Sequence, residues 1–322
     1  MSMRSLLRGA VRRICRGRPR VQWMLHGILI EATDPRDFRF LAESIADGVR
    51  RDLDEELAAP TPPVSIVWSM LWEGARLGRF GARCPKRAVF RFADREFEME
   101  LDLAESPECG YLFRHPAPPI ARLVREGGRT MLDVGANAGL HALCGRSTFA
   151  RVHAFEPNPT TAARLVRNIS MSGAEEHVRV HRVALSDRSG TASISVERGH
   201  SGASRLGADS PQDSVAVPLD TLDAVADREG IVEVDLVKID VEGHEAAVVR
   251  GGRRLLERDR PRIVVELGDI DRFRAFRALL PDGYRTFVPR GHEPPRPLSS
   301  EGDARRFRDL LFVPEERVVA VG

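Results

Sequence analysis

Residues 130–141, TMLDVGANAGLH, decide the fold of this chain. The apolar run from Thr130 to Val134 ends in glycine and carries Asp133 near its end, which predicts a buried parallel strand. The segment GANAG that follows predicts a loop whose backbone approaches a ligand closely, because glycine has no β-carbon at the contact points. A helix is expected from Leu140, with its amino end directed at whatever lies over the loop. The stretch therefore predicts the strand–loop–helix entry of a nucleotide-type ligand site.

Outward from this stretch, apolar runs of strand length alternate with helical patterns. Further strands are predicted at residues 151–155, 178–183, 235–240 and 262–267. One helix is expected from about Gly243, and another is opened by Asn158-Pro159 and ended by Gly173. The second helix keeps apolar residues on one face, namely Ala162, Leu165, Val166 and Ile169. This alternation predicts an α/β fold, with a parallel sheet covered by helices on both faces.

The first third of the chain has a different pattern. A helix is predicted from Thr33-Asp34-Pro35 to a linker at residues 58–63, AAPTPP, and a second helix at 64–80. Residues 88–101 change to a period of two on either side of Asp94-Arg95, which predicts a hairpin. We expect a helical extension over residues 1–85, acting as a cap beside the acceptor site, and one domain over residues 86–322 that begins with the hairpin.

Composition excludes several classes of protein. The chain has 322 residues, of which 42% are hydrophobic and 30% charged, which is typical of a globular protein and not of a disordered or fibrous one. A formal net charge of +2 does not call for a nucleic-acid partner. The four cysteines form no CxxC or Cys/His cluster, which argues against a zinc site and a disulfide framework. The spread of the cysteines fits a reducing compartment. No apolar stretch is long enough to span a membrane, so a cytoplasmic location is expected.

The amino end is rich in arginine before the first acid, Glu31, and Leu6, Leu7, Val11 and Ile14 fall close to helical spacing there. A helix that packs on its own domain is one interpretation. The other is a basic amphipathic helix in weak contact with anionic lipid, which would place the protein at the inner face of the membrane. Both interpretations stay open on the sequence.

Carboxylates stand at the end of each predicted parallel strand. Ligands of open parallel sheets lie beyond the carboxyl ends of the strands, so these acids collect at the edge where a ligand binds. Unpaired carboxylates near a buried edge would each cost several kcal/mol of desolvation, so they are expected to have partners. The acids are Asp133, Glu156, Asp187, Asp240 with Glu242, and Glu266.

Glu156 narrows the choice of ligand. It stands about 20 residues after Gly135, where a carboxylate that accepts from ribose hydroxyls is expected. A nicotinamide dinucleotide and S-adenosylmethionine (SAM) both have a ribose in that place. The GANAG loop lacks the second glycine of the dinucleotide fingerprint, G-x-G-x-x-G. Asp133 suits the ammonium end of SAM, which has no phosphate, so SAM is favoured.

Seven motifs follow one another along the chain: DVGANAGLH, HAFEPNP, ALSD, SGASRL, VPLDTLD, VKIDVEGHE and DLLFVPEE. Through them the chain resembles the FkbM family of SAM-dependent methyltransferases, from about residue 108 to residue 316. The resemblance implies a Rossmann-like class I methyltransferase fold, with seven strands in a mostly parallel sheet whose last strand is antiparallel. It also implies transfer of a methyl group to a hydroxyl of a sugar, a glycolipid, or a glycosylated or polyketide natural product. It says nothing about residues 1–85.

The family's functional positions can be matched to this chain one at a time. By resemblance, Glu156 is the ribose carboxylate, Asp187 the acid near adenine, and Asp240 the acid that reaches the sulfonium and the acceptor. Asp187 could equally begin a turn, because the segment Ser186–Gly190 has good turn residues. The loop that holds the amino-acid part of SAM is matched by Asp133, Gly135, Asn137 and Gly139.

A hydroxyl acceptor must lose a proton, and His244 and Asp240 are the predicted bases. His244 could instead be a packing residue at the amino end of a helix. Lys238 is also a catalytic candidate, because a lysine in an apolar strand needs a carboxylate partner, for which Asp240 or Glu266 is placed.

A metal-dependent mechanism is a further hypothesis. Asp240, Glu242, His244 and Glu266 offer mostly oxygen ligands, which would suit magnesium or manganese and a diol substrate. The alternative is a set of structural carboxylates near the cofactor.

The expected partner is a small-molecule or glycan acceptor and not a nucleic acid, because DVEG replaces the Asn/Asp-Pro-Pro-aromatic turn of many base methyltransferases. The sequence therefore predicts a SAM-dependent O-methyltransferase. The alternatives are a methyltransferase with another acceptor and a non-catalytic SAM-binding or scaffold protein.

Overall fold

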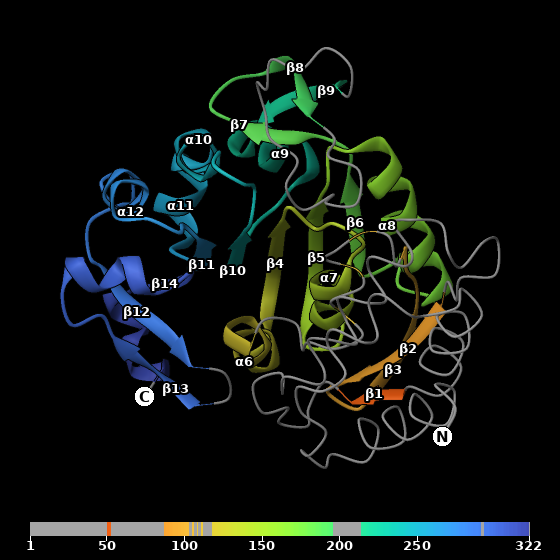
Figure 1. Cartoon of the computed structure of the whole chain (residues 1–322), viewed down its shortest axis with the longest axis horizontal. Coiled ribbons are helices and arrows are strands. Elements are labelled where there is room, and N and C mark those ends of the chain that lie inside the picture. The colour runs from red at the N-terminus through yellow and green to blue at the C-terminus, as the bar shows by residue number, and fades with distance from the viewer. Residues whose placement is uncertain are drawn as a thin grey trace, which may run out of the picture. The chain divides into compact units, whose positions relative to one another are not determined.

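The computed structural model describes residues 50–52, 87–102, 105, 108, 111, 118–195, 214–290 and 293–321 (Figure 1). The chain divides into two compact units, residues 1–115 with 198–201 and residues 116–197 with 202–322. The arginine-rich start, the predicted helix at 64–80 and most of the predicted helix from Thr33 lie outside the described residues. The predicted boundary after residue 85 lies there too and stays a prediction.

The described part of the first unit is a three-stranded sheet. Strand β1 (Arg50–Asp52) pairs in parallel with β2 (Arg87–Phe92), which forms the predicted hairpin with β3 (Arg95–Glu100). Positive φ angles at Ala93 (48°) and Asp94 (65°) make a tight turn whose twist suits the strands. The hairpin is confirmed, but the helix expected through residues 50–52 is wrong there, because pairing with β2 overrides the helical pattern.

The second unit contains an eight-stranded sheet that confirms the predicted α/β fold. Five strands pair in parallel, in the order β11, β10, β4, β5 and β6. Strand β14 is antiparallel to both of its neighbours, β11 and β12, so the expected antiparallel last strand is confirmed. A further edge strand, β13, pairs with β12. The bounds are β4 (Gly128–Val134), β5 (Phe149–Phe155), β6 (Val178–His181), β10 (Val234–Ile239), β11 (Arg262–Glu266), β12 (Tyr284–Arg290), β13 (Glu293–Pro297) and β14 (Asp309–Pro314).

Helices cover both faces of this sheet (Figure 1). One face, with Leu132, Val237 and Ile263, shares a core with α9 (Leu222–Glu229), α10 (Glu245–Gly251), α11 (Arg253–Asp259) and α12 (Ile270–Arg277). The opposite face meets α7 (Leu140–Gly145), because Gly145 lies against Met131 and Val152, which alternate with that core. Helix α6 (Pro118–Glu126) contacts α7. Successive residues along each strand therefore pack against different helices on the two faces of the sheet.

Helix α8 (Pro159–Met171) begins as predicted. Asn158 Oδ1 accepts hydrogen bonds from Thr160 N (3.0 Å) and Thr161 N (3.4 Å), and Pro159 occupies the first turn. The apolar face is buried as expected at Ala162, Leu165 and Ile169, whereas Val166 is exposed, which corrects that part of the prediction.

A small second sheet replaces part of the predicted third strand. The strand expected at 178–183 ends at His181, and the chain then forms β7 (Ala184–Ser186), which pairs with β9 (Ser214–Thr221). Strand β8 (Gly190–Ser195) completes this sheet on the other side of β9. The final described segments are the 3₁₀ helices η3 (Glu301–Arg306) and η4 (Glu315–Val321). Within the described ranges, no helix is long and apolar enough to cross a membrane.

Candidate functional site

A row of charged side chains crosses one face of the large sheet near the carboxyl ends of its parallel strands. The register pairs Asp133 with Lys238, Ile239 with Val265, and Glu266 with Asp309. Because Ile239 and Val265 belong to the core on the α9–α12 side, their neighbours along each strand point to the α7 side. The predicted collection of acids at this edge is therefore present, and we call it the charged row: Asp133, Lys238, Asp240, Glu266 and Asp309.

Lys238 is the centre of the charged row. Its side chain is 3% exposed, and Nζ donates a hydrogen bond to Gly135 O (2.6 Å). Nζ also lies 3.2 Å from Asp133 Oδ1 and 3.6 Å from Asp240 Oδ2. Burial lowers the pKa of Lys238, but the two carboxylates outweigh it and hold the pKa above its ordinary value. The side chain stays protonated at neutral pH, so it anchors the glycine loop and cannot accept a proton.

Asp133 is fully buried, and its Oδ1 lies 3.2 Å from Lys238 Nζ in an ion pair. Its Oδ2 has no hydrogen-bond partner among the described residues. Buried carboxylate oxygens are normally hydrogen-bonded, so an unpartnered oxygen at a ligand loop is suited to a donor that a ligand brings. A cationic ligand group with N–H donors, such as an ammonium, fits this position.

Glu156 follows β5 and binds the backbone on both sides of the loop. Oε2 accepts from Asn137 N (3.0 Å) and Oε1 accepts from Asn158 N (2.9 Å). Burial raises the pKa of Glu156 to about 7, although these two hydrogen bonds act against the rise. Each oxygen has a second lone pair, so the carboxylate can also accept from two neighbouring hydroxyls.

The glycines of the loop are required by protein atoms. A β-carbon on Gly135, whose φ is +79°, would lie 1.9 Å from Asp240 O, and one on Gly139 would lie 2.5 Å from Leu165 Cδ1. These glycines were predicted to allow close approach by a ligand, whereas in the structure they allow close approach by Asp240 and Leu165. Asn137 is also left-handed, with φ 49°, and Asn168 Nδ2 fixes the loop by donating to Ala138 O (2.8 Å).

His244 and Asp187 lie against the small sheet. His244 caps α10, and its Nε2 is 2.9 Å from Ser186 Oγ on β7. Burial lowers the pKa of His244. Asp187 follows β7, and its Oδ2 accepts from Arg250 Nε (3.0 Å). Both side chains therefore already have protein partners.

The structure does not bring the predicted metal ligands together, so that hypothesis is wrong as a ligand set. No group of three or more His, Cys, Asp or Glu side chains among the described residues is arranged to hold a metal ion. Instead, Asp240 pairs with Lys238, Glu266 with Arg308, and His244 with Ser186.

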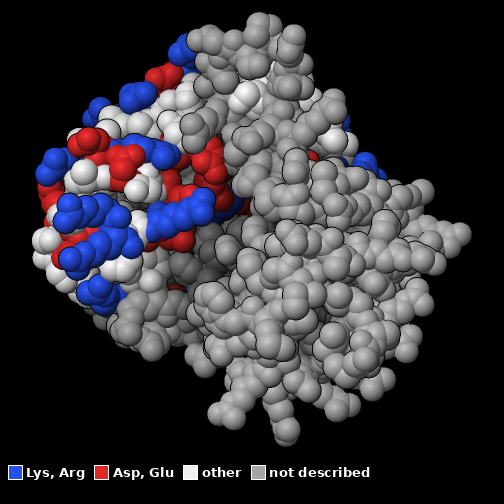
Figure 2. Space-filling view, in the orientation of Figure 1, with Lys and Arg blue, Asp and Glu red and all other residues white. Residues whose placement is uncertain are grey.

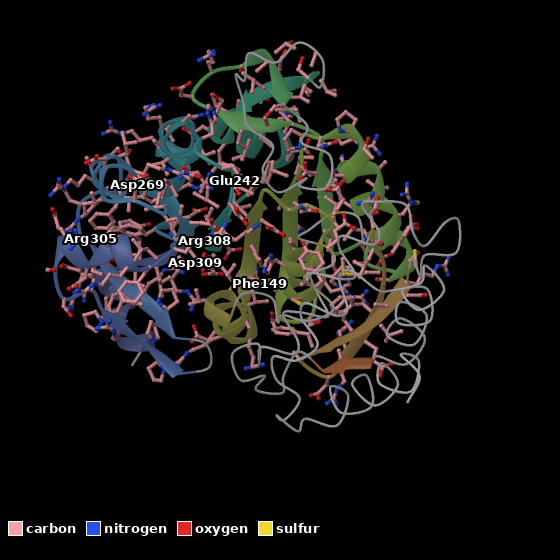
Figure 3. All side chains as sticks on the ribbon, viewed as in Figure 1. Phe149, Glu242, Asp269, Arg305, Arg308 and Asp309 are labelled. Carbon is pink, nitrogen blue, oxygen red and sulfur yellow. The ribbon has the colours of Figure 1, made fainter. Side chains whose placement is uncertain are left out.

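Arg308 and Asp309 belong to the site, although the sequence predicted no role for either. Asp309 is the first residue of β14, and because β14 is antiparallel its first residue lies at the edge where the parallel strands end. Arg308 Nε donates to Glu266 Oε1. Figure 3 labels both residues, with Glu242 nearby, and Figure 2 shows Asp and Glu gathered next to Lys and Arg on the described part of this view. The motif DLLFVPEE begins with Asp309, so an antiparallel strand at this motif is the sequence signal that indicates Asp309 at the ligand edge.

Carboxyl groups at this end of the charged row are perturbed. Burial and then the charge of Asp240 raise the pKa of Glu266 to about 7, while Arg308 acts in the opposite direction. Burial and Asp240 likewise raise the pKa of Asp309 to about 6. Perturbed pKa values of this kind are common among side chains at functional sites.

Two more residues near the site were given no role from the sequence. Glu245, in the motif VKIDVEGHE, is 2% exposed and its Oε1 accepts from Gly243 N and from Arg272 Nη2, both at 2.8 Å. It therefore ties the turn after β10 to α12. His141 on α7 has a buried Nε2 with no hydrogen-bond partner in the described part of the chain, and burial followed by Lys238 lowers its pKa to about 4.

Comparison with known proteins gives consistent matches. Residues 133–288 match the model of the methyltransferase FkbM domain. The hexuronic acid methyltransferase AglP of Haloferax volcanii is 38% identical over 125 residues, which cover 39% of this chain and 50% of that protein. The 2-O-methyltransferase NoeI of Sinorhizobium fredii is 29% identical over 162 residues, which cover 44% of this chain and 64% of that protein.

The chain thus spans about half to just under two thirds of these relatives. Among solved structures, methyltransferase FkbM from Methylobacillus flagellatus aligns with a TM-score of 0.39 and 16% identity, over 58% of this chain and 43% of that one. The matched region contains the glycine loop, Glu156 and the motif VKIDVEGHE. Through residues 133–288, just under half of its length, the chain is similar to the FkbM family of methyltransferases.

Proposed function

We propose that this chain binds SAM at the carboxyl edge of the large sheet and transfers its methyl group to a hydroxyl of a sugar. The observation that carries the proposal is Asp133, a fully buried carboxylate beside the glycine loop whose Oδ2 has no hydrogen-bond partner among the described residues. A carboxylate so placed favours a ligand with an ammonium group.

The residues of the site fit SAM along its length. Asp133 would receive the ammonium of the amino-acid tail, and Glu156, one strand away, would accept from the ribose hydroxyls. The loop from Gly135 to Gly139 would lie under the tail, with Asn137 held by Glu156. Asp240 is next to Asp133 through Lys238, which suits it to the sulfonium. The adenine contact of Asp187 stays a prediction, since that carboxylate is held by Arg250.

Bound SAM supplies an electrophilic methyl group, and the chain supplies position and charge. Holding a hydroxyl in line with that methyl can account for about 7–11 kcal/mol of the barrier. The rigid strands that carry Asp133, Lys238 and Glu266 suit this task, because their side chains are fixed by ion pairs. Lys238, which stays protonated, is proposed to hold the loop and Asp240, and not to transfer a proton.

The names of the two relatives support a hydroxylated sugar as the acceptor. AglP is named a hexuronic acid methyltransferase and NoeI a 2-O-methyltransferase. We include neither magnesium nor manganese in the proposal, because the residues considered as ligands have other partners. Contact of the arginine-rich amino end with a membrane stays a prediction on residues outside the described ranges.

Calorimetry with SAM and S-adenosylhomocysteine (SAH) tests the cofactor. Asp133→Asn is expected to weaken SAM binding at least tenfold, or about 1.4 kcal/mol, because the amide carries no charge for the ammonium. Asp227→Asn is the matched control, since Asp227 is an exposed carboxylate on α9 paired with Arg254 at 2.7 Å. Absence of heat with both ligands in folded wild-type protein would contradict the proposal.

Turnover of SAM to SAH tests the acceptor. The panel contains methyl glucuronide, methyl glucoside and an amino sugar, each with and without a chelator. Methylation of a hydroxyl in at least one sugar is expected, and its rate should not change with the chelator. Binding of SAM with no turnover on any hydroxylated acceptor would instead favour a non-catalytic SAM-binding protein.

A further inference from the structure

We infer that Glu266 is the general base that removes the proton of the acceptor hydroxyl, and that Arg308 and Asp309 are positioning residues that set its proton affinity. This inference rests on the proposed function. Glu266 was predicted from the sequence only as a metal ligand or as a partner of Lys238. Arg308 and Asp309 had no predicted role.

The order of strands gives the first argument. Across the sheet from β5 to β14, the acids at the carboxyl edge run Glu156, Asp133, Asp240, Glu266 and Asp309. Neighbouring strands are about 4.8 Å apart, and each acid lies on the strand next to that of the previous one. Asp133 pairs with Ala154 and Lys238, so it lies two residues before the level of Glu156 and Asp240. With the ribose at Glu156 and the amino-acid tail at Asp133, the reacting carbon lies toward Asp240. Glu266 is then the first carboxylate on the far side of the reacting carbon, where an attacking hydroxyl must stand.

The other candidate bases are occupied, which gives the second argument. His244 Nε2 is 2.9 Å from Ser186 Oγ on the small sheet. Lys238 stays protonated, and Asp240 Oδ2 is held 3.6 Å from its ammonium.

Glu266 itself has one oxygen fixed and one available, which gives the third argument. Arg308 Nε donates to Oε1, and no hydrogen bond to Oε2 is found among the described residues. The side chain is 23% exposed, so a hydroxyl can reach it from the edge of the sheet. An arginine that fixes one oxygen directs the other, as a base oriented by a third group requires.

The charges around Glu266 come from each element packed against it. Asp240 at the end of β10 and Asp309 on β14 raise its pKa, and Arg308 before β14 lowers it. Glu242 in the turn after β10 faces Arg308. Burial and these charges together bring the pKa of Glu266 to about 7, where a general base is both available and strong enough at neutral pH.

The step balances with SAM as the only co-reactant. The acceptor O–H gives its proton to Glu266 Oε2 while the acceptor oxygen forms a bond to the methyl carbon. The carbon–sulfur bond breaks and its electron pair stays on sulfur, which loses its positive charge. The products are a methyl ether, SAH and a protonated Glu266, which then releases its proton to water.

Glu266→Gln is the central test, with the acceptor sugar that gives the fastest turnover. The amide keeps the shape of the side chain and cannot take the proton, so kcat is expected to fall about a hundredfold or more, within the range known for general bases. SAH affinity by calorimetry should stay within twofold of wild type. Glu257→Gln is the matched control, because Glu257 forms an exposed pair with Arg253 (2.8 Å) on α11.

The positioning residues are tested by the pH profile of kcat/KM. In wild type the rate should rise with pH and level off as Glu266 ionises. Arg308→Ala removes the charge that lowers the pKa of Glu266, so the midpoint should move to higher pH. Asp309→Asn removes a charge that raises it, so the midpoint should move to lower pH. A merely structural role would not give opposite shifts.

The outcomes separate this inference from the proposed function. If Glu266→Gln binds SAH and keeps kcat within threefold of wild type, Glu266 is not the base, although the methyltransferase proposal stands. If Glu266→Gln fails to fold, the pH profiles of Arg308→Ala and Asp309→Asn test the inference instead. Unchanged midpoints of kcat/KM in both variants overturn it. If wild-type protein binds neither SAM nor SAH, or transfers no methyl group, the proposed function fails and the inference fails with it.

Discussion

Gly135 illustrates how much a single backbone position contributes to this site. Its φ of +79° is unfavourable for other residues, and a β-carbon there would overlap Asp240 O at 1.9 Å. The close approach joins the loop after β4 to the end of β10, and it places Gly135 O where Lys238 Nζ can donate to it. The geometry of the glycine loop and that of the charged row therefore both depend on Gly135.

Gly135→Ala is expected to lower the free energy of unfolding by about 3 kcal/mol or more, since backbone strain is added to an overlap with main-chain atoms. Gly173→Ala is the control. Gly173 also has a positive φ (+57°) but nothing within 4 Å of the added carbon, so about 1 kcal/mol is expected. Urea denaturation of both variants measures the difference. Equal losses would mean that the contact with Asp240 costs nothing.

Lys238→Met tests the buried ion pair at the same scale. Removing the ammonium leaves Asp133 charged, buried and without a donor, which is expected to cost about 3–5 kcal/mol of stability. The double variant Lys238→Met/Asp133→Asn should recover more than 1 kcal/mol of that loss, because no charge is then stranded. Additive losses in the denaturation cycle would show that the two groups are not coupled.

At the level of elements, strands β5 and β6 are joined by a pair of buried imidazoles. His153 Nδ1 lies 3.0 Å from His181 Nε2, and His181 also stacks on Phe155 with ring centroids 4.6 Å apart. Burial lowers the pKa of each histidine to about 4, and for His153 the neighbouring His181 adds to the shift. The pair is neutral in the folded protein, so one ring donates and the other accepts.

This pair predicts a loss of stability in mild acid. The folded pKa of each ring is below the unfolded value of 6.5, so the unfolded state binds more protons between pH 6.5 and 4. The contribution is full above pH 6.5 and is lost as the pH falls toward 4. Per ring, about 2 kcal/mol should be lost between pH 7.5 and pH 5.

His181→Phe is the variant that isolates the effect, because a phenyl ring can still stack on Phe155. Its free energy of unfolding should fall less than that of wild type between pH 7.5 and pH 5. The difference between the two proteins is the measurement, because other groups titrate in the same window. His141 acts in the same direction as the pair, and the raised pKa values of Glu156, Glu266 and Asp309 act in the opposite direction. An identical pH dependence in both proteins would contradict the prediction.

At the scale of the whole molecule, the second unit contains the entire charged row together with Glu156 and the glycine loop. A ligand that binds there stabilises that unit by mass action. SAH at one hundred times its Kd is expected to add about 2.7 kcal/mol to the free energy of unfolding. For a unit of this size, the melting temperature should rise by about 5–10 °C.

Differential scanning calorimetry of wild type and Asp133→Asn with SAH checks this effect. The variant should gain much less, since its Kd is raised and the same SAH concentration is a smaller multiple of it. The transition of the first unit is an internal control when it is resolved from the second. A shift of equal size in both proteins would place SAH away from Asp133.

The local parts of this protein can be predicted from its sequence. The strand and loop at TMLDVGANAGLH, the cap at Asn158, the alternation that gives a parallel sheet and the acids at strand ends follow from patterns that span a few turns or strand spacings. Such patterns can be recognised in the sequence because helix and strand periods and turn residues act over short distances along the chain.

Which side chains meet depends on the tertiary fold. Lys238 bonds Gly135 across 103 positions, Glu266 meets Arg308 across 42, and His244 meets Ser186 across 58, so the four predicted metal ligands are not brought together. These pairings depend on strand order, register and the antiparallel direction of β14. No local pattern contains them, because a shift of one residue in register would send every side chain of the charged row to the opposite face.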